Sequence, residues 1–226
     1  MKKIFLLSII FLFAVVISCS KRIPSEKGGI DIISNVYFDA SRGLDNMRSF
    51  HVSKLNYKHD SIIEMVPELE FPEMTKVTYF IKDSVFYVLE NDHAAALLAE
   101  VQKKQKPILV YRKNAGAIFT KDQILNYRNR RNLSDTILFK KHYKRFEINS
   151  PWNYTRYYIY PTDTILPYSF YKEVDNDYHG RIERIDSYDK QKDIFVSMQL
   201  IPRKTWDLEA EEIFKFNRYI ESRKKK

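Results

Sequence analysis

The sequence predicts an α+β protein: a mainly antiparallel, twisted β-sheet with one or two short helices and a C-terminal helix packed on it. Short runs of β-branched and aromatic residues recur along the chain with polar turns between them, which is typical of antiparallel strands. Residues 77–81 and 85–89 form the clearest pair, joined by the polar turn 82–84. Near the C-terminus, glutamates are followed by basic residues, and the apolar residues among them recur at the spacing of one helical face. Both patterns indicate a helix.

The elements around this hairpin follow from similar signals. We expect strands over residues 50–57 and 62–66. Residues 68–74 are expected to be irregular or an edge because of Pro67 and Pro72, since proline cannot donate a ladder hydrogen bond. An alanine-rich helix is expected from a cap at Asn91 or Asp92 to Lys104, and Pro107 ends it.

The middle of the chain predicts a second hairpin, from residues 108–111 and 117–119. Thr120 and Gln123 have the spacing of a capping box, so a short helix is expected as far as about Arg130.

The remaining strands are expected at residues 137–139, 146–148, 154–160, 166–171, 182–188 and 194–201. Thr205 or Asp207 can cap the last helix. It is expected to dock on the sheet through Leu208, Ile213, Phe216 and Ile220.

Residues 36–222 are expected to form a single globular domain, followed by a basic tail at 223–226. Residues 19–35 contain Pro24 and two glycines among polar residues, and they predict a flexible tether. The formal charge is +9, or +9 − 2 = +7 without Lys2 and Lys3. This charge favours anionic neighbours such as phospholipid head groups, and we expect no nucleic acid partner.

Residues 1–18 have the organisation of an export signal. Lys2 and Lys3 precede the apolar run 4–17, which is too short to span a bilayer comfortably and ends at Ser18 and Cys19. The segment resembles the lipobox of bacterial lipoprotein signal peptides, with Val16 at the position where leucine is usual. The resemblance implies cleavage after Ser18 and lipidation of Cys19. A plain secretory signal with an incidental cysteine is the alternative.

Lipidation would join the protein to a membrane through acyl chains on Cys19 and would use its only cysteine, leaving no disulfide. By the same resemblance, Ser20 in place of an aspartate favours the outer membrane, facing the periplasm. The sequence therefore predicts a membrane-anchored lipoprotein of the cell envelope.

Residues 77–201 combine a hairpin, the segment Leu166-Pro167-Tyr168 and two further strands. This order resembles the lipoprotein-carrier fold. The resemblance implies a half-open antiparallel sheet curled around a helix and used to hold acyl chains.

Residues 175–186 have part of the spacing of an EF-hand calcium loop, with Asp175, Asp177, Gly180 and Asp186 at positions 1, 3, 6 and 12. His179 is a poor ligand for calcium and the flanks suggest strands, so a polar turn explains the same residues better. The five histidines lack the spacing of a zinc site. We expect no metal and no cofactor.

Aromatic residues are concentrated between positions 152 and 171. Alternating tyrosines could place one set on an exposed face that stacks sugars or covers an apolar ligand, or they could simply fill the sheet. The candidate ligand-binding residues are Trp152, Tyr154, Arg156, Tyr158 and Tyr168.

The sequence thus favours a lipid-anchored envelope protein with a non-catalytic binding or accessory role, for an apolar ligand or a protein partner. The alternative is a hydrolase acting on an envelope polymer or glycan, because carboxylates are plentiful although no pair stands out.

Overall fold

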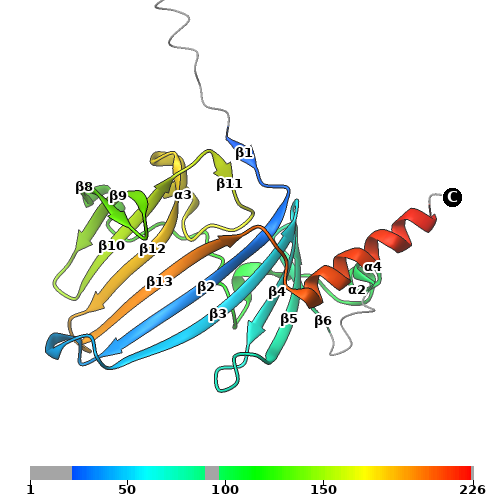
Figure 1. Ribbon diagram of the computed structural model, residues 1–226, viewed down its shortest axis with the longest axis horizontal. Helices are drawn as coiled ribbons and strands as arrows, with labels where there is room; N and C mark the ends of the chain where they lie inside the picture. Colours follow the sequence, from blue (N-terminus) through cyan, green and yellow to red (C-terminus); the bar gives the residue numbers. More distant parts are fainter. Residues whose placement is uncertain (1–21, 90–96, 225–226) are drawn as a thin grey trace, which may run out of the picture.

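The computed structural model describes residues 22–89 and 97–224. Within this part of the chain, eleven strands form one antiparallel sheet in the order β7-β6-β5-β4-β3-β2-β13-β12-β10-β9-β8 (Figure 1). The sheet curls, and its concave face holds the larger apolar core around Ile30, Leu55 and Phe146. The predicted α+β class with a dominant antiparallel sheet is confirmed.

The sheet consists of two meanders that meet in its middle. The first comprises β2 (Lys27–Phe38), β3 (Met47–Lys58), β4 (Ser61–Pro67), β5 (Thr75–Lys82), β6 (Val85–Leu89) and β7 (Ile108–Leu109). The second comprises β8 (Arg131–Leu138), β9 (Lys141–Asn149), β10 (Asn153–Pro161), β12 (Gly180–Asp189) and β13 (Ile194–Arg203). Strand β2 pairs with β13 and so joins the two meanders. Outside this sheet, β1 (Ile23–Pro24) and β11 (Thr164–Ile165) form a small parallel pair, and a short 3-10 turn, η1 (Ala40–Arg42), follows β2.

The structure differs from the expected tether over residues 19–35, because Lys27–Phe38 is a central strand. Ile30 and Ile32 of this strand are buried in the core. At Gly28 the backbone of β2 lies close to that of β13, since a Cβ there would lie 2.7 Å from the carbonyl oxygen of Arg203. Residues 27–35 therefore belong to the sheet and not to a tether.

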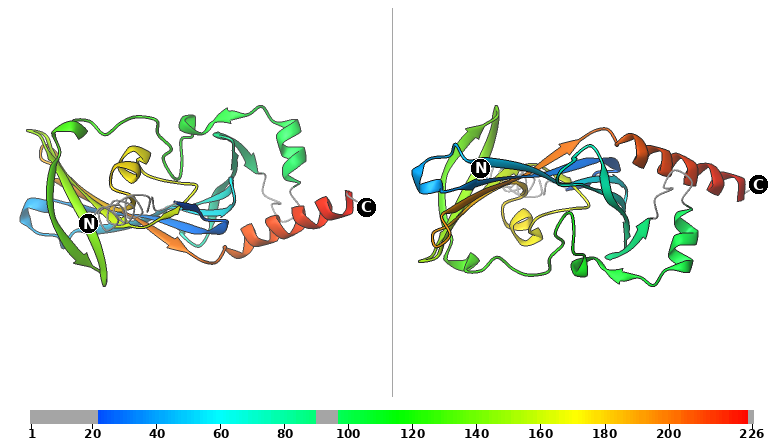
Figure 2. Two further views of the ribbon diagram at one scale, coloured as in Figure 1. Left: turned by 90° about the horizontal axis from the view of Figure 1, so that it is seen from above. Right: turned by 90° about the horizontal axis from the view of Figure 1, so that it is seen from below.

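Residues 110–130, here called the strap, run along the concave side of the sheet, and α3 (Lys172–Asp177) lies between the strap and the sheet (Figure 2). The strap contains only two 3-10 turns, η3 (Val110–Arg112) and η4 (Tyr127–Asn129), so the hairpin and the helix predicted here are wrong. Thr120 accepts a hydrogen bond from the Asp122 N–H at 2.9 Å in a turn, not at the start of a helix. A sheet curled around a helix is nevertheless present, as the carrier-like pattern implied.

The strand predicted at residues 166–171 is also wrong, because this segment is irregular and leads into α3. Pro167 has no N–H to donate to a ladder, and Tyr168 and Phe170 pack into the core instead. Val174 of α3 is completely buried in the same apolar cluster.

The C-terminal helix α4 (Leu208–Lys224) packs on the opposite face of the sheet and then extends away from it (Figure 1). Ile213 and Phe214 form a second apolar cluster with Ile63 and Phe80, while Leu208 is exposed, contrary to the prediction. Buried Asn56 fixes the helix start by accepting from the Asp207 N–H at 2.8 Å.

A shorter helix, α2 (Leu98–Lys104), confirms the end of the predicted alanine-rich helix, whose beginning lies outside the described residues. None of the described helices is both long and apolar enough to cross a membrane.

Candidate functional site

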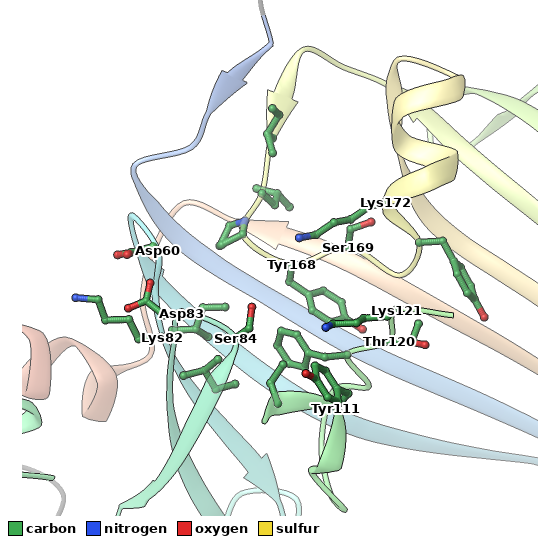
Figure 3. A pocket seen from close by; sticks show the side chains of 18 of the residues that line it. Asp60, Lys82, Asp83, Ser84, Tyr111, Thr120, Lys121, Tyr168, Ser169 and Lys172 are labelled. Carbon is green, nitrogen blue, oxygen red and sulfur yellow. The ribbon is translucent and has the colours of Figure 1, made fainter. Parts of the chain in front are cut away.

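A cavity of about 840 Å³ opens at one end of the sheet, between the sheet, the strap and residues 165–173 (Figure 3). The turns that end the β3–β4 and β5–β6 hairpins, at residues 59–60 and 83–84, form part of its mouth, together with Pro24 and Ser25. Its size lies within the range usual for sites that bury a small ligand.

The interior of the cavity is apolar. Ile62 and Ile81 come from the sheet, Phe119 from the strap, and Leu166 and Tyr168 from the segment before α3. The rings of Phe119 and Tyr168 meet edge to face with centroids 5.0 Å apart. Such a lining favours an apolar ligand through the area that it removes from water.

Tyr168 also fastens the cavity wall. Its hydroxyl donates to the carbonyl oxygen of Ile118 at 3.1 Å, which links the segment before α3 to the strap. Burial raises the pKa of Tyr168, so its hydroxyl stays protonated and can continue to donate.

The rim of the cavity is polar and carries both signs of charge. Asp60, Lys82 and Asp83 lie on one side, while Lys121 and Lys172 lie on the other (Figure 3). An apolar interior below a mixed polar rim suits an amphiphilic ligand, whose apolar part can enter while its polar end stays in water.

The strap is held over the sheet by a fully buried ion pair. Lys113 Nζ lies 2.7 Å from Glu64 Oε2, and their side chains are 1% and 0% exposed. Glu64 Oε1 also accepts from the Ala117 N–H at 2.6 Å and from the Ser53 hydroxyl at 2.8 Å. One carboxylate therefore connects β3, β4 and the strap.

Burial raises the pKa of Glu64 and lowers that of Lys113, and their mutual attraction opposes both changes. Gly116 makes this packing possible. It has φ +76°, and a Cβ at this position would collide with the Glu64 carboxylate and would come within 2.6 Å of Val66 Cγ2.

The candidate residues from the sequence are placed in two different regions. Tyr168 lines the cavity, whereas Trp152, Tyr154, Arg156 and Tyr158 do not. Tyr154, Arg156 and Tyr158 alternate with the core residue Tyr157 along β10, so they lie on the opposite face of the sheet. Trp152 is exposed in the turn before β10.

Two of these residues meet at another buried carboxylate, Glu147. It accepts a hydrogen bond from Tyr154 at 2.5 Å and lies 3.2 Å from an Arg156 nitrogen, and it also pairs with Arg131. This cluster is held together by its own ion pairs, and Tyr158 packs beside it under Arg184.

The suggested calcium loop is not formed. Asp175 lies in α3, where it accepts from the Ser169 hydroxyl and the Ile182 N–H, while Asp186 lies in β12 and pairs with Arg184. No group of three His, Cys, Asp or Glu side chains is placed to hold a metal within residues 22–89 and 97–224.

Glu64 and Lys113 were not among the residues predicted from the sequence. A single carboxylate inside the apolar run Ile62-Ile63-Glu64-Met65-Val66 was the available signal, because an ionised side chain in a buried strand requires a partner. Its partner could not be found, since Lys113 looked like a residue of a hairpin turn.

Neither a protein-family model nor a curated protein matches this chain. It is similar to a crystal structure described as an outer membrane lipoprotein-sorting protein domain from Vibrio parahaemolyticus, with 10% identity and a TM-score of 0.29, over 87% of this chain and 92% of that chain. A likeness at this level says nothing about what the chain binds.

Proposed function

We propose that this protein is a non-catalytic binding protein of the cell envelope that holds the apolar part of an amphiphilic ligand, such as an acyl chain, in its cavity. The observation that carries this proposal is the cavity of about 840 Å³ with its apolar interior and polar rim. Each methylene group moved from water into such an interior contributes about 0.8 kcal/mol to the free energy of binding, so the affinity rises with the length of alkyl chain that the cavity holds.

The position of the carboxylates disfavours the alternative of a hydrolase. Of the carboxylates that line the cavity, Glu26, Asp60, Asp83 and Asp122 are exposed at its rim. Glu173 is the only half-buried one of the five, whereas glycoside hydrolysis uses a pair of carboxylates. The buried Glu64 is occupied by Lys113, Ser53 and the Ala117 N–H. General acid–base catalysis instead requires a titratable group within reach of the reacting atoms.

We also propose that Cys19 carries acyl chains that hold the protein on the outer membrane, facing the periplasm. Cys19 precedes Arg22 by three residues, which span at most about 10 Å when extended. The cavity mouth includes Pro24 and Ser25, so this anchor would keep the mouth near the bilayer. Labelled palmitate should be incorporated into the protein and should disappear in Cys19→Ala; label that persists would contradict the anchor.

The ligand proposal is tested by titrating the full-length protein in detergent with anionic amphiphiles of increasing alkyl chain length, followed by calorimetry. We expect the affinity to rise about fourfold per added methylene until the cavity is filled, and the heat capacity change of binding to be negative. An affinity that does not depend on chain length would overturn the proposal.

Two matched variants locate the binding. Leu166 is half-buried in the cavity wall, and Leu133 is half-buried in β8 away from it. Leu166→Asp should abolish the dependence on chain length, whereas Leu133→Asp should retain it. Equal losses in the two variants would mean that the ligand does not occupy this cavity.

A further inference from the structure

The tip of the β8–β9 hairpin has an unusual sequence for its backbone conformation. Phe139 and Lys140 have φ values of 51° and 64°, both in the left-handed region, between the paired residues Leu138 and Lys141. Two-residue turns of this kind favour Asn, Asp and Gly, and a bulky side chain is strained there. The β5–β6 hairpin makes the same turn with Asp83 and Ser84, at 51° and 63°.

The strain at Phe139 is not offset by burial within the described part of the chain. Its side chain is 71% exposed, and the neighbouring Ile137 is 61% exposed. Phe139 and the partly exposed Ile201 share a hollow of about 240 Å³ on the surface of the sheet. Lys140 extends from the same tip and is exposed, whereas the Lys141 side chain turns back onto the sheet, with its Nζ 3.0 Å from Glu183 Oε2. The tip therefore presents apolar side chains beside the Lys140 cation.

The tip lies at the end of the sheet where the chain enters the domain. Arg22 donates to the carbonyl oxygen of Gly180 at 3.3 Å, and Gly180 pairs with Pro161 at the end of β10. On the other side of β10, Ile159 pairs with Lys144, close to the hairpin tip. The turns at residues 59–60 and 83–84, which form part of the cavity mouth, end their hairpins at this same end of the sheet.

The opposite end of the sheet provides an internal contrast. The loop between β4 and β5 also exposes apolar side chains, with Phe71 54% and Leu69 63% exposed. It carries Glu68, Glu70 and Glu73 in place of lysines. Anionic lipid head groups would attract the hairpin tip and repel this loop.

We propose that the β8–β9 tip inserts into the surface of an anionic lipid bilayer, with the Phe139 ring among the upper acyl carbons and Lys140 at the head groups. This proposal rests on the membrane location proposed above, but not on a ligand in the cavity. Aromatic and basic residues together are the side chains suited to such an interface. The contact turns the cavity mouth toward the lipid from which an amphiphile would enter.

The test uses the full-length protein reconstituted in vesicles that contain phosphatidylglycerol. A fluorophore attached to Ile137→Cys reports insertion through quenching by nitroxide groups on the lipid acyl chains, with the protein lacking this substitution as the reference. We expect strong quenching at the tip and little at a label on Glu70→Cys. Equal quenching at the two positions would overturn the proposal.

Phe139→Asn separates insertion from folding, because asparagine tolerates the left-handed conformation and keeps the turn. This variant should lose most of the quenching at position 137. The matched variant Phe71→Asn, at the opposite end, should retain it. Quenching that survives Phe139→Asn would contradict the proposal.

The charge contribution is measured by comparing vesicles of phosphatidylglycerol with vesicles of phosphatidylcholine. Lys140→Gln should lower the ratio of inserted to free tip about fivefold on the anionic vesicles and should have little effect on the neutral ones. An equal effect on both lipids would argue against recognition of anionic head groups. None of these readouts requires a cavity ligand, so the two proposals can fail separately.

Discussion

Glu64 and Glu147 are both buried glutamates that contact cations and a hydroxyl group, yet they lie on opposite faces of one sheet and differ in what surrounds their partners. Lys113, the partner of Glu64, is only 1% exposed. Arg131 and Arg156, the partners of Glu147, are 75% and 32% exposed. The first pair is isolated from water, whereas the second remains in contact with it.

This difference reverses the direction of the pKa change. Burial dominates at Glu64 and raises its pKa. Burial acts in the same direction at Glu147, but hydrogen bonds from Tyr154, Arg131 and Arg156 outweigh it and lower the pKa. A buried glutamate with cationic partners can therefore fasten the strap to the sheet, as Glu64 does, or stabilise a cluster that stays in contact with water, as Glu147 does.

The largest effect should follow from removing the cation of the isolated pair. Lys113→Met leaves the Glu64 carboxylate buried without its counter-charge, and we expect the free energy of unfolding to fall by about 3–5 kcal/mol. Urea denaturation measures this change. The double variant Glu64→Leu with Lys113→Met should recover most of the loss, and an equally unstable double variant would contradict the interpretation.

Gly116→Ala should have the next largest effect. The residue has φ +76°, and a Cβ would be forced against the Glu64 carboxylate and Val66, so we expect a loss of about 2 kcal/mol. Thermal unfolding is a suitable measurement. Gly43→Ala is the control, because its φ of +140° is also unusual but the nearest atom to an added Cβ, Asp45 Oδ2, is 3.4 Å away. An equal loss of stability in Gly43→Ala would mean that contact with the Glu64 carboxylate does not cause the loss in Gly116→Ala.

Glu147→Gln tests the second cluster through its dependence on pH. Because the folded pKa of Glu147 is lower than the unfolded value, its charge stabilises the fold above the unfolded pKa, and this contribution is lost as the pH falls through the folded pKa. We expect Glu147→Gln to cost about 1.5 kcal/mol at neutral pH. The difference from the native protein should vanish in acid, and a difference independent of pH would be inconsistent with this account.

Arg131→Met should have the smallest effect, about 0.5 kcal/mol, because its guanidinium is 75% exposed and well hydrated. Denaturation in low and high salt should show the loss only in low salt. A loss comparable to that of Lys113→Met would contradict the distinction between a water-excluded and a hydrated ion pair, because the two clusters would then be equivalent.

Much of the sheet could be predicted from the sequence, because alternation within strands such as 77–81 and 194–201 is a local property. The strap could not. Its conformation depends on Glu64, which lies far away in sequence and replaces the hydrogen bonds that a local hairpin would have made. Gly28 and Gly29 misled for a similar reason, since they permit close packing against β13 and the segment after it and do not provide a flexible tether.

The candidate site was only partly accessible from the sequence. The concentration of tyrosines was visible, but alternation alone does not say which set faces the core. Tyr168 was included with Tyr154 and Arg156 because of proximity in sequence, and the irregular segment before α3 carries it into the cavity while β10 holds the others on the opposite face. Lipidation of Cys19 remains a prediction.

The junction between β2 and β13 has a consequence for the order of assembly. Each meander is built from hairpins of strands that are neighbours in sequence, and such hairpins can form quickly. The centre of the sheet is complete only when Ile32 of β2 pairs with Leu200 of β13, which lies far away in sequence. Loop closure over such a separation grows only slowly more unfavourable with length, so the penalty is one of rate more than of final stability. Until β13 pairs with β2, the edges of both strands are open to pairing with other chains. A molecule in which this pairing has not yet formed is therefore prone to aggregate through these two edges.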